Sequence, residues 1–204
     1  ENAEDMEMMA AITPSDKPYL KTSVWEIWKK RIPWLLLLMI SATFTGTIIT
    51  GFESKLAASV ALTAFIPMLM DTGGNCGSQS SVTVIRSLSL DELKFEDIFR
   101  VMWKELQTAV LCGVTLAALC FVKVLVVDRM LMGNASISLL VAGVVSLTLG
   151  VTVIMAKFVG CTLPLLAKRL GFDPAVMASP LITTIVDALS LLVYFMFAKS
   201  ILGL

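Results

Sequence analysis

The chain has 204 residues, is 57% apolar and has a mean hydropathy of +0.86, which indicates a membrane protein and excludes an ordinary soluble domain. Its 16 basic and 16 acidic residues cancel and cluster between apolar runs, so no nucleic-acid partner is expected. The sequence contains no histidine, which argues against histidine-ligated metals and histidine proton relays.

The first 21 residues are polar and lack a long apolar face. Ser23 and Glu26 have the spacing of a capping box, and Trp25, Trp28 and a basic cluster at 29–31 follow them. We expect a cytoplasmic connector that ends in an amphipathic helix at the membrane surface. Because the sequence starts without methionine, we also expect it to be a piece of a longer protein.

Residues 32–204 are expected to form an all-α domain of five transmembrane helices with short interfacial helices. Each apolar run is long enough to cross a hydrocarbon core of about 30 Å at about 1.5 Å per residue. A charged, periodic segment at 90–105 predicts a surface helix before the third span, and Gly171-Phe-Asp-Pro174 predicts a tight turn before the fifth. The spans are expected at about 32–52, 56–86, 106–127, 136–167 and 175–198.

Five crossings place the two termini on opposite sides of the membrane. Lysine and arginine are concentrated on the side that holds the N-terminus. The positive-inside rule therefore predicts a multi-pass protein of the cell (inner) membrane, with a cytoplasmic N-terminus and an extracytoplasmic C-terminus.

The second span contains an unusually polar stretch at 68–81. Lipid cannot solvate these groups, so they must face protein or a water-filled path. The glycines could let another helix approach closely, or relax the helix so that carbonyls reach a ligand. Asp71, Asn75 and Gln79 share one i, i+4, i+8 row, which favours a polar path. The candidate residues here are Asp71, Gly73, Gly74, Asn75, Gly77 and Ser78.

Three charges, Asp71, Lys157 and Asp187, are expected near the membrane midplane, about 18–22 Å from the cytoplasmic helix ends. A charge at that depth is costly unless it is paired or hydrated. Lys157 is expected to pair with Asp71, which would make Asp71 structural and leave Asp187 for a cation. Pairing of Lys157 with Asp187 is the alternative.

Hydroxyl groups surround Asp187 on the fifth span. Ser179, Thr183, Asp187 and Ser190 form one stripe, which alone would indicate helix packing but with a central carboxylate favours a pore-lining face. Oxygen ligands without imidazole or a thiolate cluster point to Mg²⁺ or Ca²⁺, and Mg²⁺ would stay largely hydrated at one or two carboxylates.

Several motifs resemble the membrane domain of the MgtE family of magnesium channels and transporters. They are Phe65 to Ser81 with its Gly-Gly-Asn-x-Gly-x-Gln core, Ile85-Arg-Ser-Leu88, the Gly171–Pro174 turn, Pro180 to Asp187, and Arg31-Ile-Pro-Trp34. The similarity extends over nearly the whole chain.

The resemblance implies a homodimer in a lipid bilayer, with a central pore lined by the second and fifth spans of both subunits. It also implies that Asp187 and its symmetry mate hold a hydrated Mg²⁺. Members of the family usually carry a cytosolic N-domain and CBS domains, which are missing from this sequence; residues 1–31 resemble the connector to them.

Two departures from the family pattern bear on the ion. Ser78 and Ser179 stand where the family often has asparagine, so Ca²⁺ or Mn²⁺ at the same site remains open. The expected function is channel-like transport of Mg²⁺, and a cation-coupled carrier or exchanger is the alternative. We expect no enzyme, because no G-x-S-x-G or H-E-x-x-H motif is present.

Overall fold

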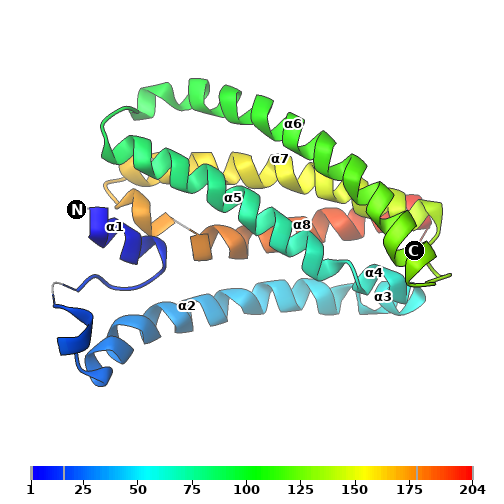
Figure 1. Ribbon diagram of the computed structural model, residues 1–204, viewed down its shortest axis with the longest axis horizontal. Helices are drawn as coiled ribbons and strands as arrows, with labels where there is room; N and C mark the ends of the chain where they lie inside the picture. Colours follow the sequence, from blue (N-terminus) through cyan, green and yellow to red (C-terminus); the bar gives the residue numbers. More distant parts are fainter. Residues whose placement is uncertain (1, 16, 178, 204) are drawn as a thin grey trace.

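The structure is a computed structural model that describes residues 2–15, 17–177 and 179–203. The long helices of this part of the chain have 24 to 31 residues and lie side by side in one bundle (Figure 1). They are α2 (Val24–Gly51), α5 (Ile66–Ser89), α6 (Ile98–Lys123), α7 (Leu139–Arg169) and α8 (Ser179–Leu202). The expected all-α class is confirmed.

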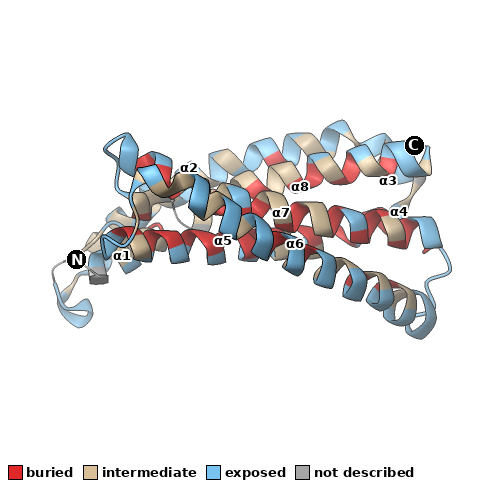
Figure 2. Ribbon diagram, turned by 90° about the horizontal axis from the view of Figure 1, so that it is seen from above, coloured by how far each residue is buried: buried red, intermediate tan, exposed pale blue. Residues whose placement is uncertain are grey.

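Helix α7 forms the core of the bundle. In its most apolar window 61% of the residues are buried, whereas the corresponding share for α2, at the edge, is 6%. Buried residues follow α7 and the sides of its neighbours that face it (Figure 2). Helices α5, α6 and α8 all pack on α7, while α2 packs on α8. An apolar helix such as α7 is stable in this position because protein covers it on most sides.

Four helical segments within the described residues are long and apolar enough to cross a membrane: Val24–Gly51, Phe95–Leu131, Leu139–Arg169 and Pro180–Leu202. They correspond to the expected first, third, fourth and fifth spans. Helix α5 is long enough to cross a membrane, but its mean hydropathy is lower than that of these four segments because it contains the polar stretch at 68–81.

The second predicted span, about 56–86, is wrong as a continuous helix. The structure breaks it into α3 (Glu53–Ala58), α4 (Val60–Thr63) and α5. Pro67 lies in the first turn of α5, where its missing N–H leaves no hydrogen bond unmade. The Tyr194 hydroxyl of α8 donates to the Leu62 carbonyl at 2.7 Å, which satisfies an oxygen at the end of α4.

The separate surface helices expected before the first and third spans are also not found. The amphipathic segment is the first turns of α2, which runs through Pro33 without interruption. The segment at 90–105 is a turn, a short 3₁₀ helix η2 (Phe95–Asp97) and the first turns of α6. Its predicted apolar face does pack: Phe95, Ile98 and Met102 lie against the core, although Phe99 is exposed.

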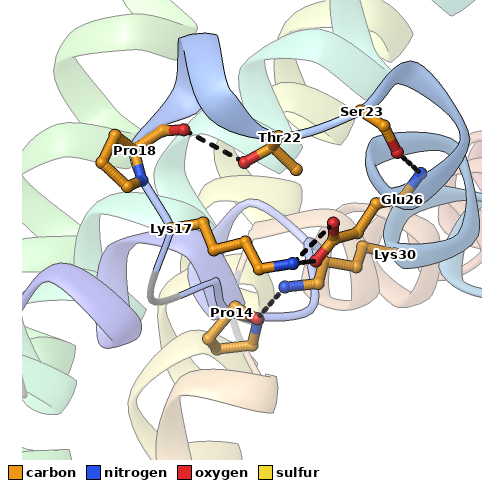
Figure 3. Close-up of polar contacts among 7 residues, drawn as sticks. All are labelled: Pro14, Lys17, Pro18, Thr22, Ser23, Glu26 and Lys30. Carbon is orange, nitrogen blue, oxygen red and sulfur yellow. Dashed lines mark hydrogen bonds and ion pairs between the residues drawn. The ribbon is translucent and has the colours of Figure 1, made fainter.

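The connector folds back on the bundle instead of extending from it. Helix α1 (Asn2–Met9) rests on the end of α5, where Met8 and Met9 contact Ile85 and Ala175. A 3₁₀ turn η1 (Tyr19–Lys21) then leads to α2, and the predicted Ser23 cap is confirmed, since its hydroxyl accepts from the Glu26 amide at 3.3 Å. Figure 3 shows Lys17 paired with Glu26 and Lys30 donating to the Pro14 carbonyl.

The turn between the fourth and fifth spans is confirmed. Gly171 has a φ of +79°, a conformation that favours glycine after a helix C-terminus. The Asp173 carboxylate accepts from the Ala175 amide at 2.8 Å and so caps the short 3₁₀ helix η4 (Pro174–Met177) that precedes α8. At the other end of the bundle, a π-helical segment η3 (Val124–Leu131) extends α6.

Candidate cation-binding cleft

A cleft of about 200 Å³ opens where α5 lies beside α8. It contains both carboxylates that were expected at one depth, Asp71 and Asp187. Asp71 and Asp187, which were predicted to lie at one depth, thus line the same cleft although their helices are distant in the sequence. The lining residues are Met70, Asp71, Gly74 and Asn75 from α5 and Thr183 and Asp187 from α8.

The exposed face of α5 orients the first carboxylate. The Asn75 amide donates to Asp71 Oδ2 at 3.3 Å, one helical turn away. Asp71, Asn75 and Gln79 are all exposed, as expected for residues in an i, i+4, i+8 row. The row therefore presents carboxylate and amide oxygens away from the bundle core, while Asp187 on α8 is partly buried beside them.

The opposite face of α5 packs through its glycines. A Cβ on Gly73 would lie 2.7 Å from Thr152 Cγ2 and 2.8 Å from Val186 Cγ1, and one on Gly77 would lie 2.7 Å from Ile182 Cγ2. Because α5 is helical from Ile66 to Ser89, no stretch of it is unwound to aim carbonyls at a ligand. Of the two roles considered for Gly73 and Gly77, the structure supports close helix packing.

Gly74 takes part both in the close packing of α5 and in the lining of the cleft. A Cβ there would lie 2.7 Å from Thr183 Cγ2, and Gly74 also lines the cleft. Its lack of a side chain keeps α5 and α8 close together at the position of the two carboxylates. Ser78, by contrast, is half-buried on α5 and is not among the residues that line the cleft.

The hydroxyl stripe of α8 divides between two environments. Thr183 lines the cleft with Asp187, and its hydroxyl also donates to the Pro180 carbonyl at 2.9 Å. Ser190 is 1% exposed and donates to the Val186 carbonyl at 2.6 Å, so it belongs to the packed interface with Gly73. The side chain of Ser179 lies outside the described part of the chain.

Lys157 contacts neither aspartate, which corrects the expected pairing. Its Nζ donates to Ser80 Oγ at 3.5 Å, and Ser80 in turn donates to Glu105 Oε2 at 2.5 Å. Among the described residues no ion pair joins Lys157 to Asp71 or Asp187. Its side chain reaches the packed side of α5 at the level of Ser80, away from the cleft at Asp71.

Sequence reasoning missed Glu105 as an interior charge. The third span was placed after it because a charged residue usually marks the end of an apolar run. The absence of any glycine or proline between 98 and 105 was the signal that the helix begins earlier, two turns before Glu105.

Apart from the Met70 thioether, a weak ligand for hard cations, the side-chain ligands in the cleft lining are the oxygens of two carboxylates, one amide and one hydroxyl. Within the described residues no cluster of three or more His, Cys, Asp or Glu side chains could hold an ion alone. Two carboxylates, one amide and one hydroxyl instead suit a cation that keeps most of its water, as Mg²⁺ does.

The four cysteines, Cys76, Cys112, Cys120 and Cys161, are not paired in disulfides.

Known proteins resemble this chain over most of its length. The family model for MgtE, described as a divalent cation transporter, matches residues 66–197. The chain is 36% identical to the magnesium transporter MgtE of Thermus thermophilus over 202 residues, which cover 99% of this chain and 43% of that protein. It is 38% identical to the MgtE of Bacillus subtilis over 196 residues, covering 94% and 40% of the two chains.

A third relative, the magnesium transporter MgtE of Enterococcus faecalis, is 31% identical over 170 residues, covering 83% of this chain and 36% of that protein. The chain thus spans about two fifths of the length of the curated relatives it matches. A family match over most of the sequence, with these relatives, shows that the chain belongs to the MgtE family of divalent cation transporters.

Proposed function

We propose that this chain is the membrane part of a transporter that conducts hydrated Mg²⁺ along the cleft between α5 and α8. The observation that carries the proposal is the meeting of Asp71, Asn75 and Asp187 in one cleft with no basic residue in its lining. Asp187 is the main ligand, and it acts through water molecules of the ion because Mg²⁺ sheds them reluctantly. Ca²⁺ and Mn²⁺ are the competing ions to be tested.

Helix α5 is proposed as a further membrane crossing, in addition to the four apolar helices. Its 24 residues reach about 36 Å, enough to cross the hydrocarbon core. It packs on α7 and α8, which are both long and apolar enough to cross a membrane. Its polar row escapes lipid if that row faces water or protein, which fits a pore wall.

A second copy of the chain is proposed to complete the pore. The exposed row of Asp71, Asn75 and Gln79 would be costly against lipid, and a homodimer axis beside α5 and α8 would cover it. The two Asp187 residues would then face one ion across the axis. The connector side of the molecule is proposed as cytoplasmic, in the inner membrane, with regulatory domains supplied by the rest of the protein.

A passive channel is favoured over a coupled carrier. Lys157 would have supported the carrier alternative if it competed with the cation for an aspartate, but it contacts Ser80 instead. Uptake by purified protein in liposomes, with Na⁺, H⁺ and voltage varied one at a time, distinguishes the two. A flux that follows only the Mg²⁺ gradient and voltage is expected, whereas a requirement for a Na⁺ or H⁺ gradient would establish the carrier.

The role of Asp187 is tested in the same liposomes. Asp187→Ala is expected to abolish Mg²⁺ uptake, with the protein still folded and dimeric by light scattering. Glu53→Ala, which removes an exposed acid at the start of α3, is the matched control and should transport normally. Near-normal uptake by a well-folded Asp187→Ala protein would refute the site.

A further inference from the structure

Three helices meet at a pair of opposite charges on the packed side of α5, of which Lys157 is buried and Glu105 is half-buried. Lys157 of α7 is 5% exposed, and Ser80 of α5 is 2% exposed. The Lys157 ammonium donates to Ser80 Oγ at 3.5 Å, and the same hydroxyl donates to Glu105 Oε2 of α6 at 2.5 Å. One serine hydroxyl thus accepts from the cation and donates to the anion.

The pair is electrically balanced within the protein. A buried ammonium or carboxylate alone would be costly, but together they sum to zero charge. The short hydrogen bond from Ser80 to Glu105 is typical of an ionised acceptor. The ammonium and carboxylate lie on either side of one hydroxyl, so neither moves without disturbing α5.

This pair lies on the other face of α5 from the cation-binding cleft and further along the helix. Ser80 follows Asp71 by nine residues on α5, a rise of about 13 Å. Gly77 lies between them: a Cβ there would be 3.2 Å from the Ala156 carbonyl, next to Lys157, and 3.4 Å from Val186, next to Asp187. In a poorly solvated helix bundle a charge at such a distance still acts on a divalent ion.

We propose that Lys157 and Glu105 form a charge-compensated pair that sets the cation affinity of the cleft, with Ser80 holding the two charges in place. This rests on the proposed function, since it assumes that the cleft binds a divalent cation. With both charges present their fields largely cancel at the ion. Loss of Lys157 leaves a negative charge that attracts the ion, and loss of Glu105 leaves a positive charge that repels it.

The test is Mg²⁺ binding by isothermal titration calorimetry to the purified chain in detergent, with thermal unfolding measured on the same samples. With an effective dielectric constant of about 40, Coulomb's law at about 13 Å predicts that Lys157→Met lowers the Kd by about tenfold and that Glu105→Gln raises it by about tenfold. The double variant should return to within about twofold of the unmodified protein. If Lys157→Met does not fold, Lys157→Gln keeps a hydrogen-bonding amide beside Ser80 and replaces it.

Two exposed residues of the same region provide matched controls. Lys104→Met and Glu96→Gln remove the same charges from solvent-facing positions and should change the Kd by less than about twofold, because water and salt screen them. A purely structural role would weaken binding in both interior variants. Shifts in the same direction, or no shift in either, would overturn the inference.

The proposed function fails separately from this inference. If Asp187→Ala leaves the Kd of the unmodified protein unchanged, the cleft is not the binding site. If Asp187→Ala abolishes binding while Lys157→Met and Glu105→Gln shift the Kd in the same direction, the site stands and the compensated pair is refuted.

Discussion

Helix α5 carries polar residues on two faces, and these faces differ in what balances them. On the exposed face, Asp71 shares a cleft with Asp187 and accepts a hydrogen bond from the neutral amide of Asn75. On the packed face, Ser80 lies between Lys157 and Glu105, whose charges cancel. Carboxylates without a basic neighbour can attract a cation, whereas a carboxylate whose charge is balanced by a lysine attracts a cation only weakly. The exposed face is therefore suited to binding and the packed face to holding the helix.

The largest effect is expected where backbones meet on the packed face. A Cβ on Gly160 of α7 would collide with the Gly77 carbonyl, so Gly160→Ala should cost about 3 kcal/mol of unfolding free energy. Gly143→Ala is the control, because no atom lies within 4 Å of a Cβ at that position of the same helix. Thermal unfolding in detergent compares the two. Equal melting temperatures for both variants would show that the contact does not constrain the bundle.

A double-mutant cycle tests the balance on the packed face. Lys157→Met and Glu105→Gln should be non-additive in unfolding free energy by about 1–3 kcal/mol, because each single change leaves the other charge without its counter-charge inside the bundle. Lys157→Met and Asp71→Asn should add to within about 0.5 kcal/mol, since the two residues are not in contact. Strong coupling between Lys157 and Asp71 would restore the pairing expected from the sequence.

On the exposed face, Asp71→Asn should change binding and not stability. Loss of one of the two carboxylates in the cleft is expected to weaken Mg²⁺ binding by about tenfold, equivalent to about 1.4 kcal/mol. The melting temperature should stay within about 2 °C, because Asp71 is exposed and packs against little. Calorimetric binding and thermal unfolding on one sample decide between this result and a structural role for Asp71.

The smallest effect is expected from Thr183→Val, which keeps the methyl group against Gly74 but removes a hydroxyl from the cleft. Mg²⁺ affinity should fall by about threefold or less, as for one outer hydrogen bond. Thr184→Val is a close control, because Thr184 donates to the same Pro180 carbonyl at 3.0 Å without lining the cleft. Identical affinities of the two variants would exclude the Thr183 hydroxyl from the site.

The sequence predicted which polar residues would lie at one depth, because rise per residue converts sequence position into height. Asp71 and Asp187 do line one cleft, and the Gly171 turn and the span at α7 are close to expectation. Height alone does not give direction around a helix. Lys157 was therefore assigned to the aspartates, although its side chain points to Ser80.

Two features of the fold could not be predicted from hydropathy. The run from Leu56 to Ile85 looks continuous because the residues around the break at 59 and 64–65 are mostly apolar. Glu105 looked like the edge of a span because helix continuity across a charge depends on a partner, and that partner, Ser80, is 25 residues away in the sequence. Such contacts appear only once the helices are packed.

The hydrogen bond from Tyr194 to the Leu62 carbonyl has a mechanical consequence for the two helices that form the cleft. It joins α8 to α4, which leads into α5, so a relative tilt of α5 and α8 that keeps this bond turns about that point. A tilt of about 5° would move the far end of α5, about 36 Å away, by about 3 Å. Asp187 is seven residues from Tyr194, about 10 Å, and would move by only about 1 Å. The end of α5 near Ser89 can therefore move while the residues that line the cleft stay nearly in place.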